Sequence, residues 1–304
     1  MKFRIFILML VSLASVVAQA TTPKSIYVFG ESFSDSGNFY YLLGEPVEGH
    51  PMFPVFTDGR IGDGPNWVDY IAENYKHVPP MEASSYGGAN YAIFGSGSGF
   101  DLGPVGTGST GLQLMQFLNE VGSINAPGNV IIAYWIGGND LMSGQDIAVT
   151  MSNIHEQLNM LIDAGALHFL VPNMVPAGFF PAIAIGTNPY NPYGLTPAEV
   201  NSAVAAFNAA LEIVLNEIKC NHPQVHLYAV DAHQLMLDVL AAPATYGFEN
   251  ITEPALLFGG DPDVSLWWDL AHFTSRFQFL LAEQAIAAID HHGGGLRCDT
   301  SALE

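Results

Sequence analysis

The 304-residue sequence has few basic residues: 8 Lys and Arg stand against 29 Asp and Glu, a formal net charge of −21. Proteins that bind a phosphate backbone use clustered cations, so this scarcity argues against nucleic acid as a partner. The same acidity opposes adsorption to anionic lipid, and any transient membrane or micelle contact must therefore come from an apolar patch. Solubility is the simplest explanation of the charge.

Cysteine is also scarce, with Cys220 and Cys298 as the only two. Neither has the spacing to other Cys or His residues that is typical of a metal site. In an oxidising compartment a lone pair is more often a disulfide than two free thiols, so we expect a Cys220–Cys298 bridge. The alternative is a buried Cys220 at a helix end and a free Cys298 in an irregular tail.

Beyond the first residues, no run of about 20 uninterrupted apolar residues indicates a transmembrane helix. The N-terminus has the pattern of a secretory signal peptide over residues 1–20. Lys2 and Arg4 precede an uncharged run from Ile5 to Val17, and residues 18–20 (AQA) are small enough for signal peptidase. We expect cleavage after Ala20 and a secreted or periplasmic protein. Loss of the two cations leaves a net charge of −23.

Hydrophobic patterning predicts strands that alternate with helices. The expected strands are 25–30, 89–94, 130–136, 167–171 and 225–230. The expected helices are 67–75, 112–121, 147–163, one that opens at the Thr196-Pro197-Ala198-Glu199 capping box, and 275–289. This alternation favours right-handed crossovers and a parallel sheet covered on both faces. We expect one α/β domain over residues 21–290, followed by an irregular tail over residues 291–304.

Five candidate site residues lie where such a sheet places its ligands, beyond the carboxyl ends of the strands. Ser32, Gly95 and Asn139 follow the first three expected strands, and Asp269 and His272 precede the last helix. Each has an ordinary structural explanation when taken alone: a cap, a turn or a core histidine. Their joint occurrence supplies a nucleophile, oxyanion donors, a base and a group that orients the base.

The chemistry of ester cleavage explains these residue types. A serine hydroxyl is a good nucleophile only when a base takes its proton, and a carboxylate fixes the tautomer of a histidine base. A three-residue separation across a turn lets Asp269 reach Nδ1 of His272 while Nε2 faces Ser32. The backbone N–H groups of Ser32 and Gly95 and the side-chain amide of Asn139 could then form the oxyanion hole.

Four sequence blocks resemble the GDSL or SGNH hydrolases, particularly secreted bacterial lysophospholipase A and acyltransferase-like members. FGESFSDSGN begins at Phe29, NYAIFGSGS contains Gly95, IGGNDL contains Asn139, and DLAH runs from Asp269 to His272. The blocks occur in the family's order over nearly the whole mature chain. One residue departs from the pattern: Glu31 stands where the family name has Asp, which shifts a carboxylate beside the nucleophile.

The resemblance implies a flavodoxin-like three-layer α/β/α fold and hydrolysis of a lipid ester through a seryl acyl-enzyme, with no cofactor and no metal. The favoured substrate is a lysophospholipid. The alternatives are a phospholipase A or glycerophospholipid:sterol acyltransferase, a carbohydrate acetylesterase, or a non-catalytic lipid-binding protein. Two apolar stretches, Phe39 to Leu43 and Met174 to Ile185, either form an acyl-chain pocket or lip, or merely cover each other.

Overall fold

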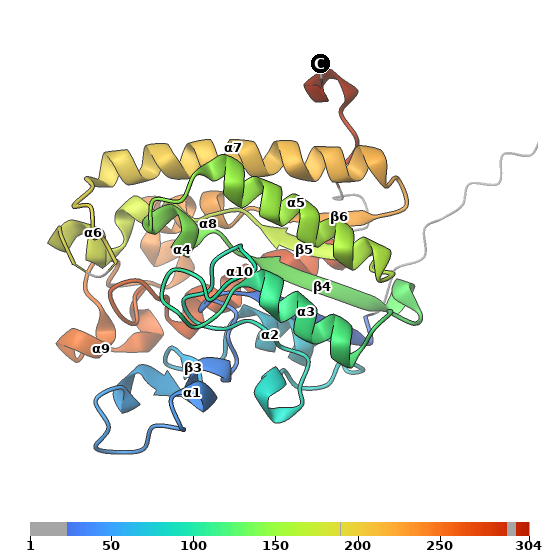
Figure 1. Cartoon of the computed structure of the whole chain (residues 1–304). Helices are drawn as coiled ribbons and strands as arrows, with labels where there is room; N and C mark the ends of the chain where they lie inside the picture. Colours follow the sequence, from blue (N-terminus) through green and yellow to red (C-terminus); the bar gives the residue numbers. More distant parts are fainter. Residues whose placement is uncertain (1–22, 189, 291–295, 304) are drawn as a thin grey trace, which may run out of the picture.

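The computed structural model describes residues 23–188, 190–290 and 296–303 (Figure 1). The expected signal peptide, residues 1–20, lies outside the described residues, so its cleavage after Ala20 stays a prediction. Residues 291–295 and 304 of the expected tail lie outside them as well.

A four-stranded parallel sheet, in the order β1-β4-β5-β6, forms the centre of the fold. Its register pairs Gly30 with Trp135, so that β1 and β4 end side by side at the carboxyl edge. All residues of β4 and β5 are buried, as expected of apolar runs in a sheet covered on both faces. The strands are β1 Ser25–Gly30, β4 Val130–Trp135, β5 His168–Pro172 and β6 His226–Val230.

The expected strand over residues 89–94 does not form, and this prediction was wrong. The segment runs beside β1, where the N–H of Val28 donates to the Ala89 carbonyl (3.1 Å) and the N–H of Tyr91 donates to the Val28 carbonyl (2.8 Å). Only Asn90 makes bridges, to Val28 and to Ala83. The chain turns at Gly95 soon afterwards, so the pairing is too short for a regular strand.

Helices cover both faces of the sheet, with α3, α5 and α7 on one side and α2 and α10 on the other (Figure 1). The predicted three-layer α/β/α fold with a central parallel sheet is therefore confirmed. The long helices are α2 Trp67–Asn74, α3 Thr110–Glu120, α5 Ile147–Asp163, α7 Pro197–Asn221, α8 Ala232–Ala241 and α10 Ser275–Asp290. The short ones are α1 Asn38–Leu42, α4 Gly138–Met142, α6 Pro181–Ile185 and α9 Ala255–Phe258, and a small hairpin joins β2 Phe56–Thr57 to β3 Arg60–Ile61.

Helix α7 begins at the predicted capping box, where the N–H of Glu199 donates to Thr196 Oγ1 and the N–H of Thr196 donates to the Glu199 carboxylate. Among the described residues it is the one helix long and apolar enough to cross a membrane by length and composition. Its buried residues include Val204, Phe207 and Leu211, which recur three and four positions apart. This stripe is typical of a core helix, and α7 packs on α5.

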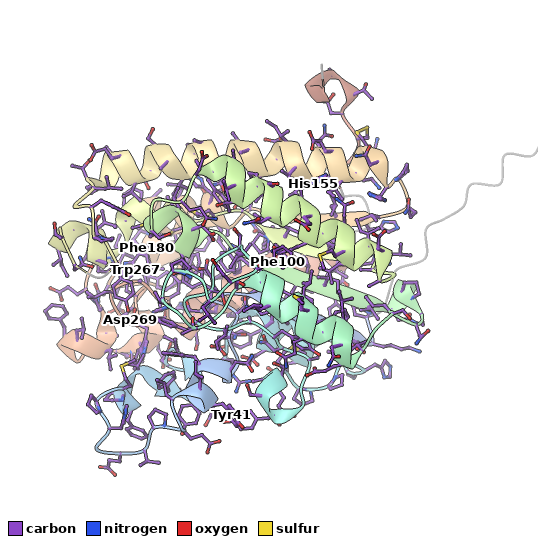
Figure 2. All side chains as sticks on the ribbon, viewed as in Figure 1. Tyr41, Phe100, His155, Phe180, Trp267 and Asp269 are labelled. Carbon is purple, nitrogen blue, oxygen red and sulfur yellow. A yellow bond between two sulfur atoms is a disulfide. The ribbon has the colours of Figure 1, made fainter. Side chains whose placement is uncertain are left out.

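The predicted disulfide between Cys220 and Cys298 is present and joins the last turn of α7 to the tail. Figure 2 shows it as a yellow bond at the end of that helix. Beside it, the side-chain amide of Asn216 donates to the Asp299 carbonyl, and the N–H of Asp299 donates back to Asn216 Oδ1, both at 2.8 Å. The tail over Thr300–Leu303 forms a short 3₁₀ helix instead of the expected irregular segment.

Reduction of this disulfide should lower the melting temperature. The bond closes a loop of 78 residues, and the loop-entropy model gives it up to about 4 kcal/mol of stability. In a chain of this size that corresponds to a loss of up to roughly 10 °C, measured by calorimetry with and without dithiothreitol. The Cys220→Ser/Cys298→Ser variant is the control, because its melting temperature should not respond to the reductant. Two free thiols titrated in the unreduced, unfolded protein would contradict the bond.

Candidate active site

Three of the predicted site residues, Ser32, His272 and Asp269, form a hydrogen-bonded triad. Ser32 Oγ lies 2.9 Å from Nε2 of His272. Nδ1 of the same ring lies 2.8 Å from Oδ2 and 2.9 Å from Oδ1 of Asp269. Asp269 and His272 are both buried, whereas Ser32 is partly exposed. In this arrangement the carboxylate holds one ring nitrogen and leaves the other to accept the serine proton.

A tight loop before α10 holds Asp269 and His272 in place. Oδ1 of Asp269 accepts hydrogen bonds from the backbone N–H groups of Ala271 (2.9 Å) and His272 (2.8 Å). The N–H of Trp268 donates to the His272 carbonyl at 2.9 Å, which closes the loop. The carboxylate therefore caps the turn and binds the ring that the turn presents, which explains the three-residue spacing in the sequence.

The electrostatics of Asp269 favour its charged form. Burial by itself raises the pKa of this carboxyl group. The charge of His272 and the hydrogen bonds from its ring, its own N–H and the N–H of Ala271 outweigh the burial, so the pKa lies below its ordinary value. Asp269 is thus a carboxylate at neutral pH and can stabilise the imidazolium that forms when His272 takes a proton.

The backbone N–H groups of Ser32 and Gly95 are free to bind an oxyanion. Within the part of the chain that the structure describes, neither group donates a hydrogen bond to another residue. Gly95 has a φ of 76°, and a Cβ there would lie 1.9 Å from Cγ2 of Val105. Only glycine fits this turn, which carries the chain from the segment beside β1 into the next loop.

The side-chain amide of Asn139 lies on the wall of the same cavity as Ser32. Its Nδ2 donates to the carboxylate of Glu31 and, at 3.0 Å, to the carbonyl of Ser96. Both amide hydrogens are therefore engaged, although the oxyanion hole expected from the sequence needs one of them as a donor. An oxyanion at this position would have to take over the hydrogen bond that Glu31 now accepts.

A cavity of about 440 Å³ opens beside Ser32 and His272. The apolar stretch over residues 174–185 contributes six side chains to its lining, Met174, Val175, Ala177, Phe180, Ala182 and Ile183, whereas the stretch over residues 39–43 contributes none. Within residues 39–43, Phe39 is buried and stacks behind the lining residue Phe94 at 4.5 Å between ring centroids, whereas Tyr41 and Leu42 are exposed. The walls are mostly apolar and include Trp135, Ile136, Met142, Met174, Val175, Phe180, Ile183 and Ala271. No described cluster of three or more His, Cys, Asp or Glu residues is placed to hold a metal ion.

The sequence profile of the GDSL-like lipase/acylhydrolase family matches residues 26–285, which is most of the chain. The chain belongs to this family. A GDSL esterase/lipase of Arabidopsis thaliana is 27% identical over 84% of this chain and 79% of its own length, and a second is 25% identical over 79% and 74%. The solved structure of a lipase/acylhydrolase from Enterococcus faecalis shares 15% identity over 88% of this chain and 96% of its own, with a TM-score of 0.46. The match to the family profile and to the two Arabidopsis relatives confirms the expected carboxylic ester hydrolase at the level of the family.

Glu31, the departure from the GDSL pattern, is buried and 4% exposed. Its carboxyl oxygens accept hydrogen bonds from the backbone N–H groups of Gly138 and Asn139, each at 3.2 Å, and from the side-chain amide of Asn139. Gly138 makes this approach feasible, because a Cβ there would lie 2.8 Å from Oε1. Burial, followed by the charge of Asp140, raises the pKa of Glu31 to about 8, although the three hydrogen bonds lower it.

This raised pKa predicts a pH-dependent effect of Glu31→Gln on stability. Between the ordinary value of 4.5 and about 8, the unfolded chain loses the Glu31 proton while the folded chain keeps it, so this residue makes the fold less stable as pH rises. The neutral glutamine removes that loss. The melting temperature of the variant should therefore rise relative to wild type from pH 5 to pH 8, as measured by calorimetry. A difference that stays flat or falls with pH would contradict the assignment.

Three buried side chains that the sequence reasoning missed join the GDSL-family blocks. Asp35 accepts from the N–H of Asn38 (2.7 Å) and of Phe94 (2.9 Å), which ties the loop after Ser32 to the turn at Gly95. The side-chain amide of Gln113 donates to the Gly30 carbonyl (2.8 Å) and to Ser96 Oγ (2.9 Å). The carboxylate of Asp140 accepts from the N–H of Ser98 (2.9 Å). Asp35 lies within the first block and Asp140 beside Asn139, but Gln113 carries no sequence signal.

Proposed function

We propose that this GDSL-family hydrolase releases fatty acid from lysophospholipids or related single-chain lipid esters. Ser32 is the nucleophile, His272 the general base and Asp269 the group that orients it. The observation that carries the proposal is the series of hydrogen bonds from Asp269 through His272 to Ser32 beside an apolar cavity. A hydrogen-bonded triad of polar side chains beside apolar walls suits an ester bond at the end of a long acyl chain.

The first step acylates the enzyme. Ser32 Oγ attacks the ester carbonyl carbon while its proton moves to Nε2 of His272, 2.9 Å away. The carbonyl oxygen becomes an oxyanion, which the N–H groups of Ser32 and Gly95 and the amide of Asn139 stabilise. His272 then gives the proton to the departing glycerol oxygen. The C–O bond breaks and the acyl chain stays on Ser32.

The second step repeats this chemistry with water. His272 takes a proton from a water molecule, and the resulting hydroxide attacks the acyl carbon on Ser32. The second tetrahedral intermediate uses the same oxyanion donors. Return of the proton to Ser32 Oγ frees the fatty acid and restores the enzyme, so that no metal or organic cofactor takes part.

The cavity supports an acyl chain as the group that binds. Its walls bring together Met174, Val175, Phe180 and Ile183, and each buried methylene of a chain contributes about 0.8 kcal/mol there. An acetylated sugar would gain little from such walls, so the carbohydrate acetylesterase alternative is less favoured. Glu31, which precedes Ser32 in the chain, and Asn139, whose amide donates to Glu31, supply polar groups beside the reacting end.

The charge of the chain supports a single-chain substrate. A secreted or periplasmic form without residues 1–20 has a net charge of −23. At low ionic strength, anionic bilayers repel such a protein by about 1 kcal/mol per charge near the surface. Lysophospholipids leave anionic aggregates more readily than two-chain lipids do, so they reach the cavity without close approach of the protein to an anionic surface.

Fatty-acid release from matched one-chain and two-chain lipids tests the proposal. We expect lysophospholipid to be cleaved faster than diacyl phospholipid, and salt to relieve part of the deficit on anionic vesicles. The assay compares both lipids at low and high ionic strength, with Ser32→Ala protein as the blank. Equal or faster cleavage of diacyl lipid in anionic vesicles at low salt would contradict it and favour a general phospholipase A or acyltransferase.

A further inference from the structure

Large apolar side chains are exposed on two segments that also line the cavity. Leu102 and Val105 lie on the loop after Gly95, and Val105 itself lines the cavity. Phe179 precedes the lining residue Phe180 and is exposed, and Ile185 at the end of α6 is 63% exposed. Single exposed apolar residues are common, but several on segments that line one cavity indicate a contact surface.

Helix α9 adds Leu257 and Phe258, and Phe258 is 68% exposed. The loop that carries Asp269 and His272 is hydrogen-bonded to both α9 and α6. The N–H of Leu256 donates to the Trp268 carbonyl (2.9 Å), and the N–H of Ala182 in α6 donates to the Leu270 carbonyl (3.0 Å). Figure 1 shows α6 and α9 along the same edge of the molecule, and in Figure 2 Phe180, Trp267 and Asp269 lie between them.

The charged residues of three segments along this edge indicate which kind of lipid surface can bind there. Residues 174–195 contain no charged side chain. The segments 96–108 and 249–263 carry only acids, one in the first and four in the second. Since these three segments offer no Lys or Arg, they cannot attract an anionic headgroup, but they suit an interface with no net charge.

We propose that Leu102, Val105, Phe179, Ile185, Leu257 and Phe258, the mouth rim, dock on the surface of zwitterionic phosphocholine lipid aggregates. Burial of these side chains in the headgroup region supplies the binding free energy. Docking brings the cavity mouth against the aggregate, and a single acyl chain then passes from the lipid into the cavity without crossing water. This inference rests on the proposed lipid-ester function and adds the surface that delivers the substrate.

Vesicle flotation with catalytically inactive protein tests the rim directly. Ser32→Ala protein is mixed with phosphatidylcholine vesicles, and the bound fraction is compared with that of the same protein carrying Ile185→Ser, Leu257→Ser and Phe258→Ser. None of these three residues lines the cavity. We expect the rim variant to bind at least about tenfold more weakly. Ile213→Ser on α7, where the isoleucine is 50% exposed, is the matched control and should bind like the parent.

Activity of the same rim substitutions on the Ser32 background separates docking from chemistry. The rim variant should hydrolyse the water-soluble ester p-nitrophenyl acetate at the wild-type rate but cleave micellar lysophosphatidylcholine several-fold more slowly. Unchanged vesicle binding, or an equal loss in the Ile213→Ser control, would overturn the proposal. A shift of the monomer–dimer equilibrium without a change in vesicle binding would also overturn it, because the rim would then join two copies of the chain.

The two proposals fail in different ways. If wild-type protein cleaves lysophosphatidylcholine while vesicle binding does not depend on the rim, the function stands and the docking surface is wrong. If Ser32→Ala protein floats with vesicles through the rim but wild-type protein releases no fatty acid from lysophospholipid, the docking surface stands and the substrate is wrong.

Discussion

Replacement of Ser32 by alanine is expected to lower kcat/KM for ester hydrolysis by at least about 10⁴-fold. Without the hydroxyl, no acyl-enzyme forms, and only the oxyanion donors and substrate binding remain to accelerate attack by water. The measurement is fatty-acid or p-nitrophenol release by purified protein at several substrate concentrations.

The fold should survive this change, because Ser32 Oγ bonds only to His272 among the described residues and is partly exposed. The melting temperature of Ser32→Ala protein should stay close to that of wild type. Ser143→Ala is the matched control: Ser143 lines the same cavity, but its hydroxyl donates to the Asp140 carbonyl and not to His272. Substantial residual activity in the Ser32→Ala protein would mean that the nucleophile lies elsewhere.

Asn139→Ala is expected to lower kcat by roughly 10²- to 10³-fold, the usual effect of removing one oxyanion donor. The amide is held beside Ser32 by Glu31 and the Ser96 carbonyl, so it is positioned before the oxyanion forms. As negative charge develops on the substrate oxygen, the hydrogen bond to Glu31 is the one that can be exchanged. Saturation kinetics, which separate kcat from KM, measure the effect.

Asn153→Ala serves as the comparison for Asn139. Asn153 belongs to α5 and its amide donates to Ser98 Oγ at 3.1 Å, in the same loop network but outside the cavity lining. Its removal should change stability more than kcat. An unchanged kcat in Asn139→Ala protein would exclude this residue from the oxyanion hole and leave the N–H groups of Ser32 and Gly95 as the donors.

Much of the fold follows from hydrophobic patterning. The run 130–136 is apolar on both faces and forms the central strand β4, and the 147–163 periodicity matches α5. Hydrophobic patterning gave a wrong strand prediction where strand pairing depends on residues that are distant in the sequence. Residues 89–94 have strand composition, yet only Asn90 forms bridges, because the chain turns at Gly95. The patterning did not predict helix α8, although Asp231 caps it. The helix begins directly after β6, so no loop in the sequence separates the two elements.

The residues of the candidate site were accessible from the sequence because each is tied to a local pattern. Asp269 and His272 are three positions apart, and one loop accounts for both the spacing and the hydrogen bond. The roles of Glu31 and Gln113 could not be read this way. Glu31 meets Asn139 across 108 positions, and Gln113 meets Gly30 across 83, so only the folded chain brings them together.

Covalent labelling by a long-chain alkyl p-nitrophenyl phosphonate tests the central claim most directly, because phosphorus takes the place of the ester carbonyl carbon and the serine adduct is not released. We expect one adduct per chain, located on Ser32 by peptide mass spectrometry, with loss of lysophospholipid hydrolysis in proportion to labelling. Ser32→Ala protein should remain unlabelled. An adduct on another residue, or hydrolysis that survives complete labelling of Ser32, would contradict a seryl acyl-enzyme at this site.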